Sequence, residues 1–209
     1  MKKLILVLGM VSIVAWGCSK TSPTSPGNGG NPQVIPLAVG NWWAYGPEGG
    51  NATDTSKVTA HTSYNGNSAY VITYTNHPED TLIAFYEGDF LKALTTVGTD
   101  TTRTHILINY LKLPLRVGES WLSYDTTVIY NGAPFRVVDS ALVVSQEAVN
   151  VPAGNFNNAY KIKFTTKIIY NGNVVRTTYR YDFIVDGIGE VKNISNEGRV
   201  NVLYGYYIQ

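Results

Sequence analysis

This sequence is poor in the residues that define disulfide-rich or strongly charged proteins. It has one cysteine and two methionines among 209 residues, and charged residues make up only 15% of the chain. One cysteine cannot form an internal disulfide, so side-chain packing must stabilise the fold. The formal net charge of +1 gives no general attraction to nucleic acid, and we expect no nucleic-acid partner.

Long hydrophobic runs are also scarce, and the clearest one follows Lys2 and Lys3 at residues 4–16. At about 13 residues it is too short to span a bilayer but has the length of a signal-peptide core. Gly17 and Cys18 come next. This order resembles a bacterial lipoprotein signal with its lipobox, which implies lipid attachment at Cys18 after cleavage. The alternative is an ordinary secretory signal with an incidental cysteine.

Three parts of the chain differ in composition. Residues 1–17 form the expected signal peptide. Residues 18–34, the lipidated Cys and a Ser-, Pro- and Gly-rich stretch, cannot offset the entropy cost of ordering and are expected to be a flexible linker. Residues 35–209 form one domain of a length that suits a single hydrophobic core. In lipoproteins, a Ser rather than an Asp after the cysteine favours the outer membrane, so we expect an outer-membrane lipoprotein; its periplasmic or surface face stays open.

The residues that are abundant point to β structure, since the chain has 15 Tyr, 4 Trp and 20 Gly. Tyr-Asn-Gly occurs at residues 64–66, 130–132 and 170–172, and Asn-Gly between extended runs is typical of a type I′ hairpin turn. Two more turns are expected, around Gly88 and near residues 196–198. We predict an all-β domain, an antiparallel meander of about ten to twelve strands that forms a curled barrel, a half-barrel or a sandwich.

The third Tyr-Asn-Gly turn allows the strand register to be predicted. Pairing outward from its tip sets Phe164 opposite Tyr179 on an aromatic face. The other face then carries basic side chains, with Lys163 directly opposite Arg180. The simplest interpretation is a solvated face neutralised by acids on adjacent strands, for which Asp139, Asp186 and Glu190 are candidates. The functional alternative is an anion-binding stripe. That stripe would consist of Lys163, Lys167, Arg176 and Arg180.

The second Tyr-Asn-Gly turn gives a less regular hairpin. The same outward pairing sets Tyr124 opposite Asp139, which interrupts the alternation of apolar and polar residues. An extra residue in one strand would restore the pattern. We therefore predict a β-bulge near Tyr124.

A second repeat occurs as PLAVGNWW at residues 36–43 and PLRVGESW at residues 114–121. The Tyr-Asn-Gly turns follow the two copies at different distances, so we interpret the repeat as a reused strand-entry motif rather than a duplicated domain. Its tryptophans should cap the core. If they faced a cavity instead, Trp42, Trp43 and Trp121 would be aromatic contacts for a ligand.

The stretches IPLAVGNWWAY, VPAGNFNNAYKIKF and DGIGEVK together resemble a group of uncharacterised bacterial lipoproteins. The shared pattern is a Pro-Leu-x-x-Gly-x-x-Trp opening, a Val-Pro-Ala-Gly-x-Phe loop before a long strand, and a Gly-x-Gly-x-Val strand near the end. The resemblance implies an all-β extracytoplasmic domain of the cell envelope. It implies no catalytic or binding residues.

Sequence motifs of known chemistry are missing. The histidines are far apart, and HPED at residues 77–80 lacks a metal-ligand spacing. Gly187 and Gly189 have neither the third glycine nor the helix of a dinucleotide site. We expect no metal, no cofactor and no catalytic residues.

Three classes of function remain. The first is a membrane-tethered binding or structural module of the envelope, whose partner would be an envelope protein, a glycan or a lipid. The second is a carrier of apolar ligands in an aromatic-lined β cavity. The third is a glycan-active enzyme, which would need two carboxylates converging in a cleft, and we expect no such pair.

Overall fold

The computed structural model describes residues 33–78, 80–97, 104–130 and 132–209. These residues form an all-β structure, and they offer no helix that could cross a membrane. The prediction of an all-β meander with ten to twelve strands is confirmed. The strands are β1 (Trp42–Pro47), β2 (Asp54–Tyr64), β3 (Asn67–Tyr74), β4 (Thr81–Glu87), β5 (Phe90–Val97), β6 (Thr104–Lys112), β7 (Ser120–Tyr130), β8 (Ala133–Val151), β9 (Gly154–Tyr170), β10 (Asn173–Val185), β11 (Gly189–Ile194) and β12 (Val200–Tyr207).

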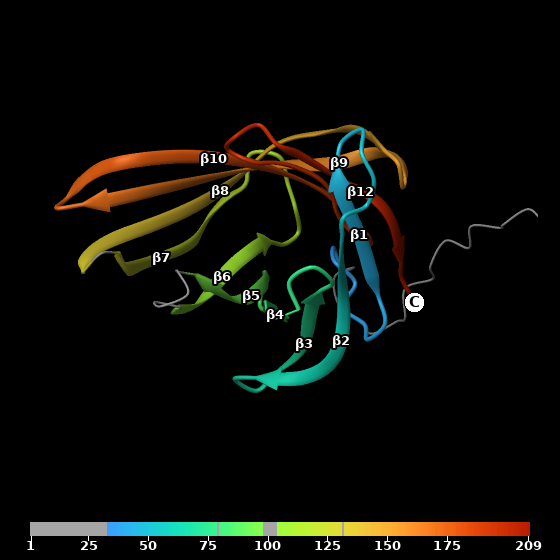
Figure 1. The fold of residues 1–209 in the computed structure, drawn as a ribbon, viewed down its shortest axis with the longest axis horizontal. Coiled ribbons are helices and arrows are strands. Elements are labelled where there is room, and N and C mark those ends of the chain that lie inside the picture. The colour runs from blue at the N-terminus through green and yellow to red at the C-terminus, as the bar shows by residue number, and fades with distance from the viewer. Residues whose placement is uncertain (1–32, 79, 98–103, 131) are drawn as a thin grey trace, which may run out of the picture.

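The twelve strands form one antiparallel sheet in the order β6-β5-β4-β3-β2-β1-β12-β11-β10-β9-β8-β7. Two six-stranded meanders, β1–β6 and β7–β12, therefore meet where β1 pairs with β12. The sheet curls until β6 approaches β7, which gives a nearly closed barrel (Figure 1). At this seam the indole N–H of Trp121 donates a 2.9 Å hydrogen bond to the carbonyl of Asn109. Side chains thus bridge a seam for which the described residues show no strand pairing.

Two of the three predicted Asn-Gly turns lie within the described residues and are present there, whereas the turn at residues 130–132 includes Asn131, which lies outside them. Asn65 and Asn171 have φ values of 49° and 50°, and the glycines after them have φ values of 82° and 79°. Both central residues therefore lie in the left-handed region that a type I′ turn requires. The turns expected at Gly88 and near residues 196–198 also lie where predicted, between β4 and β5 and between β11 and β12.

The register predicted for the β9–β10 hairpin is wrong beyond its first two pairs. A β-bulge at Val175 shifts the pairing by one residue, so that Arg180 lies opposite Phe164 and Tyr181 opposite Lys163. The bulge turns Arg180 to the inner face while Lys163 stays on the outer face. It thereby separates two like charges that the unshifted register would have placed opposite each other.

The β7–β8 hairpin follows its predicted register. Tyr124 lies opposite Asp139, and the register shifts between Leu122 and Tyr124, which is the predicted bulge. On β8, Asp139 lies two positions before the buried Ala141, so it points to the inside of the barrel and is itself buried.

The two Pro-Leu-x-Val-Gly-x-x-Trp copies have the same local structure. Gly40 N–H donates to the carbonyl of Val58 on β2, and Gly118 N–H donates to the carbonyl of Val143 on β8, each at 2.9 Å. The two motifs precede β1 and β7, the first strands of the two halves. The interpretation as a strand-entry motif is confirmed. The two halves that these motifs begin also have the same number of strands.

The core fills much of the barrel and continues under the long β8–β9 hairpin. Phe164, Ile162, Ile184 and Val58 are almost fully buried. The β8–β9 turn reaches β12, where the N–H of Ala153 donates to the carbonyl of Leu203 at 3.0 Å. Val34, just before the predicted domain start, is also buried.

Candidate functional site

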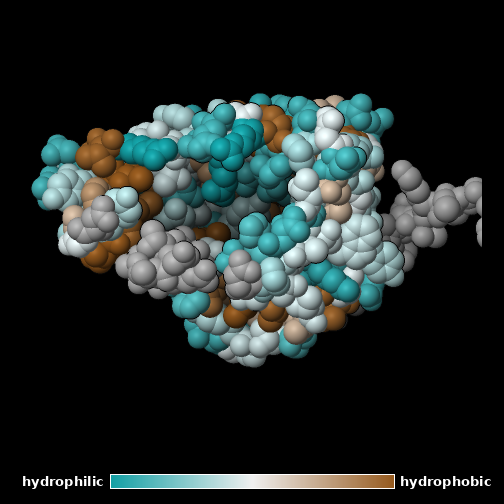
Figure 2. Space-filling view, in the orientation of Figure 1, coloured by the Kyte–Doolittle hydropathy of each residue, from teal (hydrophilic) through white to brown (hydrophobic). Residues whose placement is uncertain are grey.

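A cavity of about 420 Å³ lies inside the barrel, between strands of both halves. Figure 2 shows a hollow near the centre of one face of the molecule, bordered above by hydrophilic residues. Most of the cavity wall is apolar or aromatic, and a smaller part is polar. The apolar and aromatic residues are Ile35, Trp43, Tyr45, Ile72, Tyr74, Leu82, Ala93, Ile108 and Tyr110. The polar residues are Thr53, Asp54, Ser56, Glu190, Asn193 and Asn201.

A second hollow, of about 570 Å³, lies on the outer face of β7, β8 and β9, where Leu122, Leu142 and Lys163 line it. It is larger but somewhat more open to solvent than the interior cavity. Ligand sites usually combine an enclosed apolar wall with a few convergent polar groups. Of the two, the interior cavity has that combination, so we place the candidate site there.

The polar end of the cavity centres on the hydroxyl of Tyr110. This oxygen lies 3.2 Å from Oδ2 of Asp182 and 3.2 Å from Oε2 of Glu190. Asn193 Nδ2 donates a 2.6 Å hydrogen bond to Oε1 of Glu190. Since β6 supplies Tyr110 while β10 and β11 supply the acids, the cluster exists only because the sheet curls into a barrel.

The number of protons in this cluster decides how many of its contacts can be hydrogen bonds. A tyrosine hydroxyl has one hydrogen and can donate it to one carboxylate at a time. If both Asp182 and Glu190 are ionised, one of their contacts with Tyr110 lacks a proton. If one carboxyl group is protonated, it can donate to the Tyr110 oxygen while the hydroxyl donates to the other, and all contacts are hydrogen bonds. The geometry therefore favours one bound proton.

The pKa values of the two acids agree with this count. Burial raises the pKa of Glu190 to about 7, and the negative charge of Asp182 acts in the same direction. Burial also raises the pKa of Asp182, against the opposing effect of Arg180. Near neutral pH, Glu190 is the group that gains or loses the proton.

Arg180 lies beside the acids on the inner face. Its Nε is 3.3 Å from Oδ1 of Asp182, and its guanidinium carbon is 3.9 Å from the ring centroid of Phe164. Asp139 accepts a 2.6 Å hydrogen bond from Thr166, and its second oxygen has no hydrogen-bond partner among the described residues. Asp182 thus pairs with Arg180 directly. Against the opposing effect of burial, the charges of Asp182, Asp139 and Glu190 raise the pKa of this arginine.

Two further tyrosines near the acids have raised pKa values. Burial, followed by the charge of Glu190, holds the pKa of Tyr45 well above its usual range and raises the pKa of Tyr74. The hydroxyl of Tyr45 donates to the main-chain carbonyl of Glu190 at 2.9 Å. Neutral phenols therefore line the cavity next to the acids.

Comparison with known proteins establishes the fold. No protein-family model matches the chain, and no curated protein is significantly similar to it in sequence. A candidate exported protein with a YmcC-like fold from Bacteroides fragilis has a TM-score of 0.53 and 17% identity, with 85% of this chain and 100% of that chain covered. A candidate lipoprotein from Parabacteroides distasonis has a TM-score of 0.55 and 15% identity, with 84% of this chain and 99% of that chain covered.

The three candidate tryptophans have different places. Trp43 lines the cavity, and its indole N–H donates to the carbonyl of Ile188 at 2.7 Å. Trp121 is buried edge-on against Phe164, with ring centroids 6.4 Å apart. Trp42, the neighbour of Trp43, lies on the outer side of β1, where its ring approaches Gly205. Of the three, only Trp43 lies where a ligand in the interior cavity could contact it.

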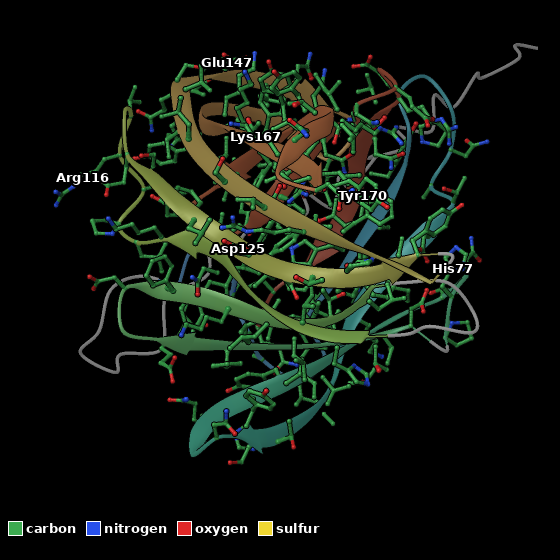
Figure 3. All side chains as sticks on the ribbon, turned by 90° about the vertical axis from the view of Figure 1, so that its left-hand side faces the viewer. His77, Arg116, Asp125, Glu147, Lys167 and Tyr170 are labelled. Atoms are coloured by element: carbon green, nitrogen blue, oxygen red, sulfur yellow. The ribbon has the colours of Figure 1, made fainter. Side chains whose placement is uncertain are left out.

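The four residues of the predicted basic stripe do not share one face. Lys163 lies on the outer face, 4.2 Å from the ring centroid of Tyr179. Lys167, which Figure 3 labels on β9, and Arg176 are exposed. Arg180 points inward to Asp182, so the stripe as predicted is not formed. Arg176 lies four residues before Arg180 on β10 and therefore on the same face of the sheet, whereas Lys163 and Lys167 share the opposite face. Anion binding by Lys163, Lys167 and Arg176, which are all at least partly exposed, stays a prediction.

The expectation concerned two carboxylates converging in a cleft at the spacing of a hydrolase, and two carboxyl groups do come together in this structure in a different setting. Asp182 and Glu190 meet at Tyr110 inside the barrel. A glycosidase, however, needs open space between its two carboxyl groups for the sugar. The Tyr110 side chain occupies that space, and Asp182 does not line the cavity. The pair is therefore not arranged for hydrolysis.

The predicted lipid-attachment site cannot be placed in the structure. Cys18 and the signal peptide fall outside the described part of the chain. Within that part, no three His, Cys, Asp or Glu side chains gather as a metal site would require. The sequence did not predict Tyr45, Asp54, Tyr74 and Tyr110 as site residues. Glu190 was predicted only as an acid that neutralises the basic stripe. No local pattern marks them, because each is one polar residue in an ordinary strand.

Proposed function

We propose that this chain is a lipid-anchored protein of the bacterial outer membrane whose barrel binds a small molecule in its interior. The observation that carries the binding role is the cavity of about 420 Å³. Its size falls within the range of small-molecule sites, roughly 300–1,000 Å³. Its wall combines a continuous apolar part with one polar cluster, which would orient a bound molecule.

The location is supported by separate observations. The basic residues, apolar run and Gly17-Cys18 pair form a lipoprotein signal. The two structures of the same fold carry names that describe an exported protein and a lipoprotein. Acyl chains at Cys18 would hold the barrel at a membrane surface, because each buried CH₂ contributes about 0.8 kcal/mol.

A cavity-filling variant tests the binding role. The neutral probe 3-phenylpropanol should bind the full chain at one site in a calorimetric titration. Ala93 is buried and lines the cavity, so Ala93→Leu should weaken binding at least tenfold. Ala60 is exposed on β2, and Ala60→Leu should leave binding unchanged. Equal binding by all three proteins, with matching circular-dichroism spectra, would contradict the interior site.

The anchor is tested by labelling. When the full chain is produced in a diderm bacterium with radiolabelled palmitate, label should appear on the wild-type protein and be absent from Cys18→Ala. Density-gradient separation of the membranes should place the wild type in the outer-membrane fraction. An unlabelled wild-type chain would reject the anchor and leave the cavity proposal standing.

A further inference from the structure

We propose that the ligand of the interior site is an organic cation, an amine with an apolar body, whose positive charge pairs with Glu190. This inference rests on the proposed interior site and specifies its chemistry. It draws on the charges of the wall, the hydrogen bonds already made by the wall and the aromatic rings around the acid.

The charge of the cavity wall has one sign. Asp54 and Glu190 both line the cavity, and none of the described lining residues is Lys, Arg or His. The nearest base in the polar cluster, Arg180, is already paired with Asp182 and stacked on a ring. An anionic ligand would therefore meet two carboxylates without a counter-ion, whereas a cationic ligand would meet two partners.

Several hydrogen-bond donors of the wall are already occupied. Trp43 donates to the carbonyl of Ile188, and Tyr45 donates to the carbonyl of Glu190. Asn193 donates to the Glu190 side chain. A bound carboxylate or phosphate needs free donors, and the indole of Trp43 and the hydroxyl of Tyr45 have none to spare, while Asn193 has already committed one of its two N–H groups. A bound ammonium group needs acceptors or negative charge instead.

Glu190 can act as that acceptor. A carboxylate has about four lone-pair positions, and the hydrogen bonds from Asn193 and Tyr110 use one on each oxygen. These two bonds fix the carboxylate in place, while its remaining lone pairs are open to a ligand in the cavity. A quaternary ammonium, which cannot donate a hydrogen bond, would still be attracted by the charge.

Aromatic rings surround the same place. Trp43, Tyr45, Tyr74 and Tyr110 all line the cavity, and each ring has a negative face that attracts cations. Aromatic rings combined with a carboxylate form the usual recognition site for substituted ammonium groups. The aliphatic residues Ile72, Leu82 and Ile108 supply the apolar wall for the rest of the ligand.

A probe series with one apolar body tests the charge preference. The 3-phenylpropyl group is attached to trimethylammonium, to hydroxyl or to carboxylate, and binding to the full chain is measured by calorimetry at pH 8. The cation should bind at least tenfold more tightly than the neutral alcohol, and the carboxylate should bind more weakly than the alcohol. Glu190→Gln should remove most of the difference in affinity between the cation and the alcohol, and it should leave the affinity for the alcohol unchanged.

Two further variants complete the test. Glu147 lies on the outside in an ion pair with Lys161, and Glu147→Gln, which removes one negative charge away from the cavity, should change nothing. Asp54→Asn keeps an oxygen acceptor for the N–H groups of Thr55 and Asn76. It should weaken binding of the cation and leave binding of the other two probes unchanged. This variant keeps the proposal testable if Glu190→Gln does not fold.

The outcomes separate the two proposals. If the cation and the alcohol bind equally and Asp54→Asn alters neither, the cation inference is rejected while the interior site stands. If the carboxylate binds best, the inference is also rejected. If none of the three probes binds and Ala93→Leu has no effect, the interior site itself is rejected.

Discussion

The hydroxyl of Tyr110 lies 3.2 Å from Oε2 of Glu190, so β6 of the first half touches β11 of the second across the barrel. Two features follow from this contact. It places an acid with a raised pKa in the wall of the cavity. It also makes the stability of the barrel depend on protonation of one of the two acids, because the Tyr110 hydroxyl has only one hydrogen to donate and lies next to both Glu190 and Asp182.

The stability of the protein should therefore depend on Glu190 in a defined pH window. The folded pKa of about 7 exceeds the ordinary value of 4.5. A proton bound more tightly in the folded state stabilises it below about pH 4.5, and this stabilisation is lost as pH rises through about 7. Glu190→Gln should remove that dependence. Between pH 5 and 8, the free energy of unfolding of the variant should rise relative to wild type by about 2 to 3 kcal/mol.

Urea unfolding at a series of pH values measures this difference. Glu147→Gln serves as the control, because its carboxyl group is on the outside and should give a curve parallel to wild type. If the curve for Glu190→Gln is also parallel to wild type, the proton is not held where the structure places it.

The β9–β10 hairpin shows which parts of the fold local sequence can predict. The turn at Asn171 was predictable because positive φ values at two successive residues demand Asn-Gly there. The bulge at Val175 was not, because nothing near Val175 in the sequence requires it. Its cause is the barrel interior, where Arg180 can pair with Asp182 and stack on Phe164.

This difference leads to a prediction about two basic residues that sequence analysis had placed on one face. Arg180→Gln should destabilise the protein by about 3 kcal/mol, because it leaves Asp182 buried without its counter-ion. Lys163→Gln should cost no more than about 0.5 kcal/mol, because Lys163 lies over the half-exposed ring of Tyr179 on the outer face. Chemical denaturation of both variants at pH 7 measures the two values. Equal losses would support the unshifted register.

The candidate site shows the complementary limit of sequence analysis. Tyr110 lies 72 residues before Asp182 and 80 residues before Glu190. Their meeting depends on how far the sheet curls, and periodicity within a strand does not report curvature. The cavity-lining place of Trp43, in contrast, was one of two alternatives that the strand-entry motif suggested.

If a cation binds beside Glu190, its affinity should depend on pH through the protein. The trimethylammonium probe keeps its charge at every pH, so titration of the protein alone changes its binding. Its affinity should increase about tenfold from pH 6 to pH 8, as Glu190 ionises, and proton release should accompany binding near pH 6.5. Calorimetry in buffers of different ionisation enthalpy measures both. The other titratable or charged groups near Glu190 come from five strands and are Tyr45, Asp54, Tyr74, Tyr110, Arg180 and Asp182.

The control for this titration is the neutral 3-phenylpropanol, whose affinity should change little over the same range. In Glu190→Gln the cation should lose its pH dependence. A dependence that persisted in this variant would assign the titration to another group, with Asp182 as the first to test.

The seam between β6 and β7 should be the most easily opened part of the barrel. The bond from the indole N–H of Trp121 to the carbonyl of Asn109 spans the seam, and the described residues show no strand pairing there. Trp121→Phe removes this bond but keeps an aromatic ring next to Phe164, so we expect a loss of about 1 kcal/mol. Hydrogen exchange should become faster in β6 and β7 before other strands, because opening of the seam needs no ladder to break.

Trp43→Phe is the matched control, since it also removes one indole hydrogen bond, to the carbonyl of Ile188. Trp43 lies on β1, which is paired on both sides, with β2 and with β12. Its variant should lose a similar amount of stability without faster exchange in β6 and β7. If both variants raise exchange equally in all strands, the seam is not a separate opening unit and the barrel unfolds as a whole.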